Sequence, residues 1–188
     1  MKNTLITEIR EHKRATDFVE NELLDSILEI SKLISVAIHA SKKVYLFGNG
    51  GSASDAQHIA AEFTGRFVKE RKGLPAIALT TDTSALTAIG NDYGFENIFS
   101  RQVEALAKEG DILIGISTSG KSLNVIRAIE MGLNIGCKTI TFTGNNGGKL
   151  INMSDYNINI ESSVTARIQE MHILIGHLIC VVIDELNQ

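Results

Sequence analysis

Residues 48–58 read Gly48-Asn49-Gly50-Gly51-Ser52-Ala53-Ser54-Asp55-Ala56-Gln57-His58, and they connect the apolar run Val44–Phe47 to the helical pattern Ile59-Ala60-Ala61-Glu62-Phe63. This order predicts a strand that ends in a glycine turn, with a helix beginning just beyond it. The first turn of a helix carries unpaired N–H groups and the positive end of the helix dipole, so the turn suits an anion. His58 and Glu62 share one face of that helix. A phosphate or sugar site is therefore expected beside a candidate acid/base or metal-binding pair.

Length and composition set the broad class. The 188 residues suffice for one domain with a sizeable core, and 44% hydrophobic and 21% charged residues are typical of globular proteins. The net charge of −4 argues against a dedicated nucleic-acid binder. There is no apolar run of about 20 residues and no signal-peptide pattern. Cys137 and Cys180 lie far apart in apolar surroundings, which favours buried reduced thiols. We expect a cytoplasmic protein that binds neither nucleic acid nor membranes.

Short apolar runs alternate with helical patterns after residue 40. The expected strands are Val44–Phe47, Ala76–Leu79, Ile112–Ile116, Thr139–Phe142 and, more weakly, Tyr156–Ile160. The expected helices are Ala53–Val68, Ser84–Ile89 continuing through Ile98–Ala107, Ser122–Leu133, Gly148–Asn152 and Ala166–Leu186. This alternation predicts an α/β fold, a doubly wound and mainly five-stranded parallel sheet flanked by helices, with ligands beyond the carboxyl ends of the strands.

An N-terminal helical pair is expected within residues 1–40, at Leu5–Val19 and Leu23–Ala40. Its apolar positions are too many for an isolated hairpin, so they predict packing on the core or on another subunit. We treat residues 1–188 as a single domain that includes this pair.

A second ligand loop follows the strand Ile112–Ile116 and reads Ser117-Thr118-Ser119-Gly120-Lys121-Ser122. Its hydroxyl groups and its position at a helix start can supply donors to phosphate oxygens. From Gly115 the sequence also spells the G-x-x-x-x-G-K-S pattern of a nucleotide-binding P-loop. Gly115 is expected inside the strand, and no apolar strand ends in a magnesium-binding Asp, so the pattern disfavours nucleotide hydrolysis.

The last predicted helix carries Gln169 and His177, eight positions apart, so both can border one cavity. With His58 and Glu62 they offer two imidazoles, a carboxylate and an amide oxygen, a donor set that suits zinc or another divalent ion although glutamine is a weak ligand. The residues alone favour helix histidines with satisfied hydrogen bonds over a metal site. His172 is interpreted as structural.

Between the two loops, Asp82 or Thr83 is expected to cap a helix, and Asn91 and Asp92 are expected in a turn. The functional alternative makes Asn91 and Asp92 polar contacts to a sugar hydroxyl. Turn chemistry alone favours the structural interpretation.

The chain resembles the phosphoheptose isomerases of the sugar isomerase (SIS) fold. The motifs are Gly48-Asn49-Gly50-Gly51-Ser52-Ala53-x-Asp55-Ala56-Gln57-His58-x-Ala60-Ala61-Glu62, Gly90-Asn91-Asp92, Ser117-Thr118-Ser119-Gly120-x-Ser122 and Arg167-Ile168-Gln169-Glu170-x-His172-x-x-x-x-His177. They extend over nearly the whole chain. The resemblance implies conversion of sedoheptulose 7-phosphate to D-glycero-D-manno-heptose 7-phosphate, the entry to ADP-heptose and lipopolysaccharide core or capsule synthesis. It also implies a homotetramer with shared active sites and one zinc ion per subunit at His58, Glu62, Gln169 and His177.

Aldose–ketose isomerisation moves a proton between C1 and C2 through an enediol, so it needs a base at carbon and an acid at oxygen. We assign Glu62 as the carbon base and His177 as the acid/base partner, with a metal polarising the carbonyl. The substrate phosphate is expected at Ser117, Thr118, Ser119 and Ser122, and the sugar chain at Asn49, Gly50, Gly51, Asn91, Asp92, Glu62 and Gln169. The glycine turn then serves the reacting end of the sugar rather than its phosphate.

The alternative is a non-catalytic binding protein of the same fold, of the replication-initiator-associating type, which this chain also resembles at Gln57-His58 and Arg167–His172. That type lacks the groups matching Glu62 and His177. A pure scaffold has no physical need for this acid/base pair, which favours the enzyme.

Overall fold

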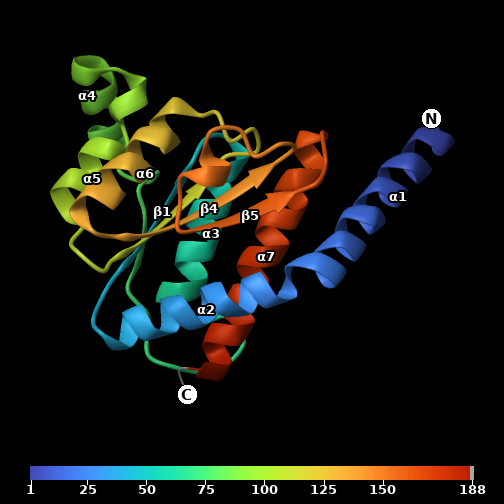
Figure 1. Cartoon of the computed structure of the whole chain (residues 1–188), viewed down its shortest axis with the longest axis horizontal. Helices are drawn as coiled ribbons and strands as arrows, with labels where there is room; N and C mark the ends of the chain where they lie inside the picture. Colours follow the sequence, from blue (N-terminus) through green and yellow to red (C-terminus); the bar gives the residue numbers. More distant parts are fainter. Residues whose placement is uncertain (187–188) are drawn as a thin grey trace.

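A computed structural model describes residues 1–186 (Figure 1). Its centre is a parallel five-stranded sheet in the order β2-β1-β3-β4-β5. The strands are β1 (Val44–Gly48), β2 (Ala76–Ala78), β3 (Ile112–Ile116), β4 (Lys138–Gly144) and β5 (Tyr156–Ile160). The larger helices are α1 (Lys2–Phe18), α2 (Leu24–His39), α3 (Gly51–Thr64), α4 (Thr83–Tyr93), α5 (Ser100–Leu106), α6 (Leu123–Ile135) and α7 (Thr165–Leu186). The predicted fold class is confirmed, and all five strands lie where the apolar runs indicated.

Each face of the sheet has its own apolar core, because successive strand residues point to opposite sides. Val44 and Leu46 of β1 join the core beneath α2, α3 and α7, whereas Tyr45 and Phe47 join the core beneath α5 and α6. All four side chains are fully buried. This double coverage explains why β1 and β3 read as uninterrupted apolar runs.

The N-terminal helices follow one another end to end, joined by a π-helical turn, η1 (Val19–Leu23). In Figure 1 they form one bent rod, with α2 packed against α7 and the start of α1 reaching beyond the rest of the molecule. Leu5 and Ile9 of α1 are largely exposed. The apolar positions of this rod therefore cover the core only in part.

The predicted continuation from Ser84–Ile89 through Ile98–Ala107 is wrong. Gly94, at φ +86°, ends α4, and a short 3-10 turn, η2 (Phe95–Asn97), leads to α5. A left-handed residue cannot continue a right-handed helix. The predicted Asp82 cap is confirmed, since its carboxylate accepts a hydrogen bond from the Ala85 N–H at 2.9 Å.

Polar contacts fix α7 to the rest of the fold at two levels. His172 is fully buried, and its Nε2 is 2.9 Å from the carbonyl of Thr143 in β4. Near the end of α7, Asp184 pairs with the Arg71 guanidinium at 2.6 Å, and both side chains are almost completely buried. Asp184 also accepts hydrogen bonds from the N–H groups of Val68 and Lys69. The predicted structural role of His172 is confirmed.

Arg71 joins α7 to the end of α3. It donates hydrogen bonds to the backbone carbonyls of Glu62 and Phe63, both at 2.9 Å, as well as to the Asp184 carboxylate. Burial alone would raise the pKa of Asp184, but the Lys69 and Val68 N–H groups and Arg71 together hold it below its usual value. The carboxylate therefore stays ionised inside the protein.

Of the helices in the described chain, α7 alone is long and apolar enough to cross a membrane by length and composition. Buried residues make up 44% of its apolar window, and they pack against the sheet and α3. The apolar character of α7 is thus explained by its place in the core.

Both cysteines are free and buried. Burial raises the pKa of Cys137 to about 11 and that of Cys180 to about 12. The expectation of buried thiols without a disulfide is confirmed, and neither thiol forms a reactive thiolate near neutral pH.

His172 makes the stability of the fold depend on pH. Burial lowers its pKa to about 4 against an ordinary 6.5, although the bond to the Thr143 carbonyl works in the opposite direction. Below pH 6.5 the unfolded chain binds a proton that the folded protein does not, so the free energy of unfolding falls as pH falls towards 4. We expect about 2 kcal/mol of this loss by pH 5. Urea unfolding of the wild type and His172→Gln at pH 7 and pH 5 measures it; equal pH dependence would contradict the assignment.

Breaking the Arg71–Asp184 pair should strongly destabilise the protein. Asp184→Asn leaves a buried guanidinium without its counter-ion, at a cost of about 3–5 kcal/mol in the free energy of unfolding. Urea unfolding at pH 7 gives the value. Glu185→Gln, the same change at the exposed neighbouring position, is the control and should stay within about 0.5 kcal/mol of wild type. A comparable small loss in both variants would show that the pair does not anchor α7.

Candidate active site

The face of α3 that turns towards α7 carries three residues of the opening segment, followed by Glu62. Gly51, Asp55, His58 and Glu62 are spaced by three or four positions, so they line one side of the helix. His58 Nε2 lies 3.2 Å from Glu62 Oε1. The Glu62 side chain is 25% exposed and that of His58 is 50% exposed. The predicted pair therefore exists and is open to solvent.

Helix α7 brings Gln169 and His177 to the same face. His177 Nε2 lies 3.4 Å from His58 Nε2, and the two rings meet edge to face. The Gln169 amide lies over Gly51, where a Cβ atom would come within 2.5 Å of Nε2. All four proposed metal ligands thus lie along the contact between α3 and α7, with Gln169 towards the glycine turn and His177 beside His58.

Phe67 is a neighbour of this cluster that the sequence did not indicate. Its ring stacks on the His177 imidazole, with centroids 5.3 Å apart and planes inclined by 26°. Phe67 belongs to the connection from α3 to β2, which the Val68 and Lys69 bonds to Asp184 hold in place. The aromatic ring limits how far the imidazole can turn.

Asp55 adds a carboxyl group to the same face of α3. Its Oδ2 atom is buried and has no hydrogen-bond partner within residues 1–186. Burial raises the pKa of Asp55 to about 6, although the neighbouring His58 acts to lower it. This carboxyl group therefore gains or loses its proton close to neutral pH.

The backbone N–H groups that follow the glycine turn donate hydrogen bonds to carbonyls of the turn itself, contrary to the expectation of an open anion site. Gly50 has φ +55°, and the N–H groups of Ala53 and Ser54 both donate to its carbonyl. The Ser52 N–H donates to the carbonyl of Asn49 at 3.0 Å. Three of the expected free donors are therefore engaged within the turn, which weakens its case as the phosphate site.

The serine loop leaves β3 at the same edge of the sheet. Ser117 and Ser122 hydroxyls lie 2.9 Å apart, and Ser119 Oγ accepts a hydrogen bond from the Lys121 N–H. Gly120, at φ +62°, packs so closely on the backbone of Gly147 that no side chain would fit. Thr118 and Ser119 are at least partly exposed. The loop is thus a turn constrained at Gly120, with hydroxyl-bearing residues before and after that glycine.

Gly115 lies inside β3, as the rejection of a P-loop required. It is buried, and an added Cβ would meet the Val125 side chain at 2.9 Å. Its role is therefore to let α6 pack on the sheet.

An amide pair joins the two loops. Asn49 Nδ2 donates to Asn124 Oδ1 at 2.9 Å, and Asn124 Nδ2 donates to Asn49 Oδ1 at 2.8 Å. The sequence indicated Asn49 as a sugar contact and gave no signal for Asn124, which is 75 residues away.

Asn91 and Asp92 are not brought to the α3–α7 cluster. Both are exposed in the last turn of α4 rather than in a turn between elements, and Asn91 Nδ2 donates to Asp92 Oδ1 at 2.8 Å. A cavity of about 200 Å³ does lie beside the glycine turn, and α4 contributes Leu86 to its lining. Neither Asn91 nor Asp92 lines it, so their contact with a sugar stays a prediction.

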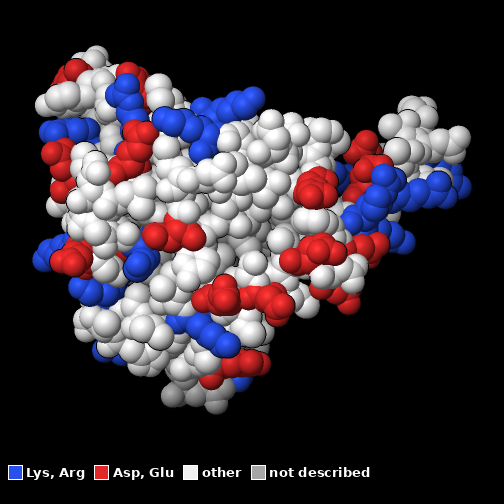
Figure 2. Space-filling model, viewed as in Figure 1, with Lys and Arg blue, Asp and Glu red and all other residues white. Residues whose placement is uncertain are grey.

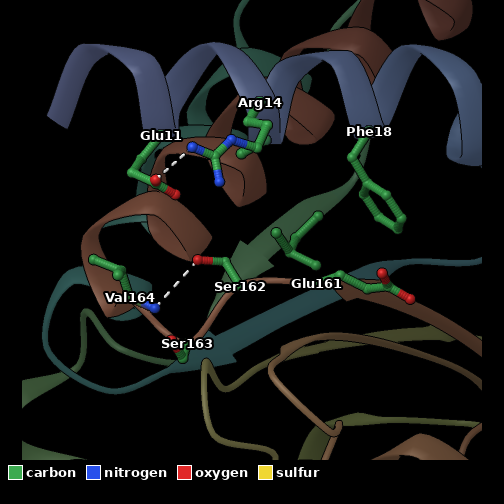
Figure 3. A pocket seen from close by; sticks show the side chains of 9 residues that line it. Glu11, Arg14, Phe18, Glu161, Ser162, Ser163 and Val164 are labelled. Carbon is green, nitrogen blue, oxygen red and sulfur yellow. Dashed lines mark hydrogen bonds and ion pairs between the residues drawn. The ribbon is translucent and has the colours of Figure 1, made fainter. Parts of the chain in front are cut away.

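A separate cavity of about 380 Å³ lies between α1 and the connection from β5 to α7 (Figure 3). Arg14 pairs there with Glu11 at 2.8 Å, and the Val164 N–H donates to Ser162 Oγ at 3.2 Å. Its lining includes none of the predicted site residues.

The face shown in Figure 2 carries interspersed acidic and basic side chains around an uncharged middle.

The cluster between α3 and α7 offers nitrogen and oxygen donors of the kinds that bind zinc. Within residues 1–186, no group of three or more His, Cys, Asp or Glu side chains is arranged to hold a metal ion as it stands. However, the two pairs that share His58, at 3.2 Å and 3.4 Å, have about the spacing of neighbouring ligands around tetrahedral zinc, whose bonds are roughly 2.0–2.1 Å long. In chemistry and in these two spacings His58, Glu62 and His177 fit such an ion, whereas Gln169 lies over Gly51, about two helical turns from His58 along α3.

Comparison with known proteins agrees with this architecture. The SIS domain family model matches residues 9–144. The phosphoheptose isomerase of a Nitratiruptor species is 58% identical, over 95% of both chains. That of Aliarcobacter butzleri is 54% identical, over 98% of this chain and 97% of the relative. The phosphoheptose isomerase structure from Neisseria gonorrhoeae has a TM-score of 0.93 at 45% identity, covering 98% of both chains. This chain therefore belongs to the SIS domain family, among the phosphoheptose isomerases, and is a sugar phosphate isomerase.

Proposed function

We propose that this isomerase converts sedoheptulose 7-phosphate to D-glycero-D-manno-heptose 7-phosphate through an enediol. The observation that carries the proposal is the cluster of His58, Glu62 and His177 on α3 and α7. It combines a partly buried carboxylate with two imidazoles, the groups that proton transfer between adjacent carbon and oxygen atoms requires. The resemblance of the whole chain to phosphoheptose isomerases supports the choice of substrate.

The serine loop holds the phosphate in this proposal. Ser117, Thr118, Ser119 and Ser122 supply hydroxyl donors in a turn whose shape is fixed by Gly120. An anchored phosphate limits which carbons of the sugar can reach α3, and this orientation lowers the entropic part of the barrier. The glycine turn and Gln169 then contact the sugar chain.

Glu62 moves the proton at carbon. Its carboxylate takes the C1 proton of the open-chain ketose while the C2 oxygen gains a proton, which gives the enediol. The same carboxylate returns a proton to C2 as the C1 hydroxyl loses its own, and the aldose results. His177 exchanges protons with the oxygens, and its contacts with His58 and Phe67 hold the imidazole in place.

Zinc is the metal we propose at His58, Glu62 and His177, and the resemblance to phosphoheptose isomerases implies Gln169 as the fourth ligand. When bound, such an ion polarises the substrate carbonyl and stabilises negative charge on oxygen. Glu62 has two carboxylate oxygens, so one could bind a metal while the other accepts the proton from the substrate carbon.

We also propose a homotetramer in the cytoplasm with shared active sites. Exposed apolar side chains along the N-terminal rod, among them Leu5, Ile9, Leu24 and Leu28, support an assembly in which other copies cover it. The product would enter ADP-heptose synthesis for a surface polysaccharide. A non-catalytic scaffold remains the alternative, and it has no use for the acid/base cluster.

The decisive experiment incubates the protein with sedoheptulose 7-phosphate, with and without a chelator, and follows the aldose product. We expect product without chelator and a marked loss after metal removal, restored by added zinc. If the chelator leaves product formation unchanged, the proposed role of the metal is refuted. If no product forms with zinc present, the proposed substrate is refuted.

Glu62→Gln should abolish turnover while leaving the sugar phosphate bound. Losing the general base lowers kcat by about a hundredfold to ten-thousandfold. Titration calorimetry should give an affinity for the substrate close to that of wild type. In D2O the wild type should place deuterium at C1 of the ketose and C2 of the aldose, and the variant should not; Glu185→Gln serves as the control. Deuterium exchange at the wild-type rate in Glu62→Gln would assign the base elsewhere.

A further inference from the structure

The Asn49–Asn124 pair is a reciprocal amide contact between the glycine turn and the first turn of α6, which follows the serine loop. Each side chain donates to the carbonyl oxygen of the other, at 2.9 Å and 2.8 Å. Asn124 is only 3% exposed, and its Oδ1 also accepts a hydrogen bond from the Val125 N–H. A buried amide that loses its partner pays a desolvation penalty, so the pair favours a single arrangement of both side chains.

The pair lies where it can fix the positions of the glycine turn and the serine loop relative to each other. β1 and β3 are neighbouring parallel strands, and their last paired residues are Gly48 and Ile116. Beyond that point the two strands no longer pair: β1 leads into the glycine turn and β3 into the serine loop. Asn49 follows Gly48 directly, and Asn124 lies in the first turn of α6, two residues after Ser122. The amide pair thus bridges the loops just where the backbone hydrogen bonds of the sheet stop.

We propose that Asn124 is a positioning residue that, through Asn49, sets the separation between the phosphate loop and the reacting end of the sugar. The inference rests on the function proposed above. Ser122 and its neighbours hold one end of the substrate, and the turn at Asn49 leads into α3, which carries Glu62. A shift of one loop against the other would leave the phosphate bound but move C1 and C2 away from the carboxylate.

The same contacts change the interpretation of Asn49. One N–H and one lone pair of its amide are engaged by Asn124, so its first role is to hold the turn. The second N–H of the amide remains for the sugar.

The test is Asn124→Ala, with Asn134→Ala as the matched control at an exposed position of the same helix. We expect kcat to fall by about tenfold to a hundredfold in Asn124→Ala while KM changes by less than about threefold. The affinity for inorganic phosphate, measured by calorimetry, should match wild type, because the serine loop itself is intact. A kcat within about twofold of the control would refute the proposal, and so would a parallel loss of phosphate affinity.

Asn49→Ala breaks the same contact from the partly exposed side and guards against misfolding of the Asn124 variant. If the two residues act as one unit, the double variant should lose no more activity than the more impaired single variant. Losses that multiply would show that the residues act separately and would refute the proposal.

A readout independent of turnover separates this inference from the proposed function. In ¹⁵N spectra, the side-chain NH2 signals of Asn49 should shift in Asn124→Ala and stay in place in Asn134→Ala. If the wild type does not convert sedoheptulose 7-phosphate, the proposed function fails and these signals still decide whether the pair exists. Unshifted Asn49 signals in Asn124→Ala would refute the pair.

Discussion

The close packing of α3 on α7 is the contact on which the candidate site depends. Two glycines permit it: a Cβ at Gly51 would come within 2.5 Å of the Gln169 amide, and one at Gly176 would come within 2.5 Å of the Ile59 side chain. Because these positions lack side chains, the helices lie close enough for His58 and His177 to meet at 3.4 Å. His177 lies 119 positions from His58, and only this packing brings it to the His58–Glu62 pair.

The stability of α7 and the geometry of the cluster are coupled. His172 links the first half of the helix to β4, and Asp184 links its end to Arg71. Arg71 in turn binds the Glu62 carbonyl near the end of α3, where backbone acceptors lack helical partners. A buried ion pair is costly to form and costly to break, so its retention here is better explained by fixing the two helix ends than by net stabilisation.

Much of the fold followed from local pattern. The inner strands β1 and β3 were predictable because both faces of the sheet are covered, which makes them apolar runs, as at Ile112–Ile116. His58 and Glu62 were predictable as a pair because helix geometry alone places residues at this spacing together. The break at Gly94 was missed because a glycine inside a helical pattern is compatible with either continuation, as at Gly90 within α4, or termination.

Contacts between distant segments were beyond a single sequence. Asn124 and Arg71 carry no local signature, since an asparagine after a helix start or an arginine in a connection is usually solvated. Their partners lie 75 and 113 positions away. The sequence also did not show that the N–H groups of the glycine turn would be engaged by its own carbonyls. That finding favours different roles for the glycine turn and the serine loop. In the proposed function the serine loop supplies hydroxyl groups to the substrate phosphate, whereas the glycine turn starts α3 at a fixed place. Under that proposal, the contact between Asn49 and Asn124 fixes the loop proposed to hold the phosphate relative to α3, the helix that carries Glu62.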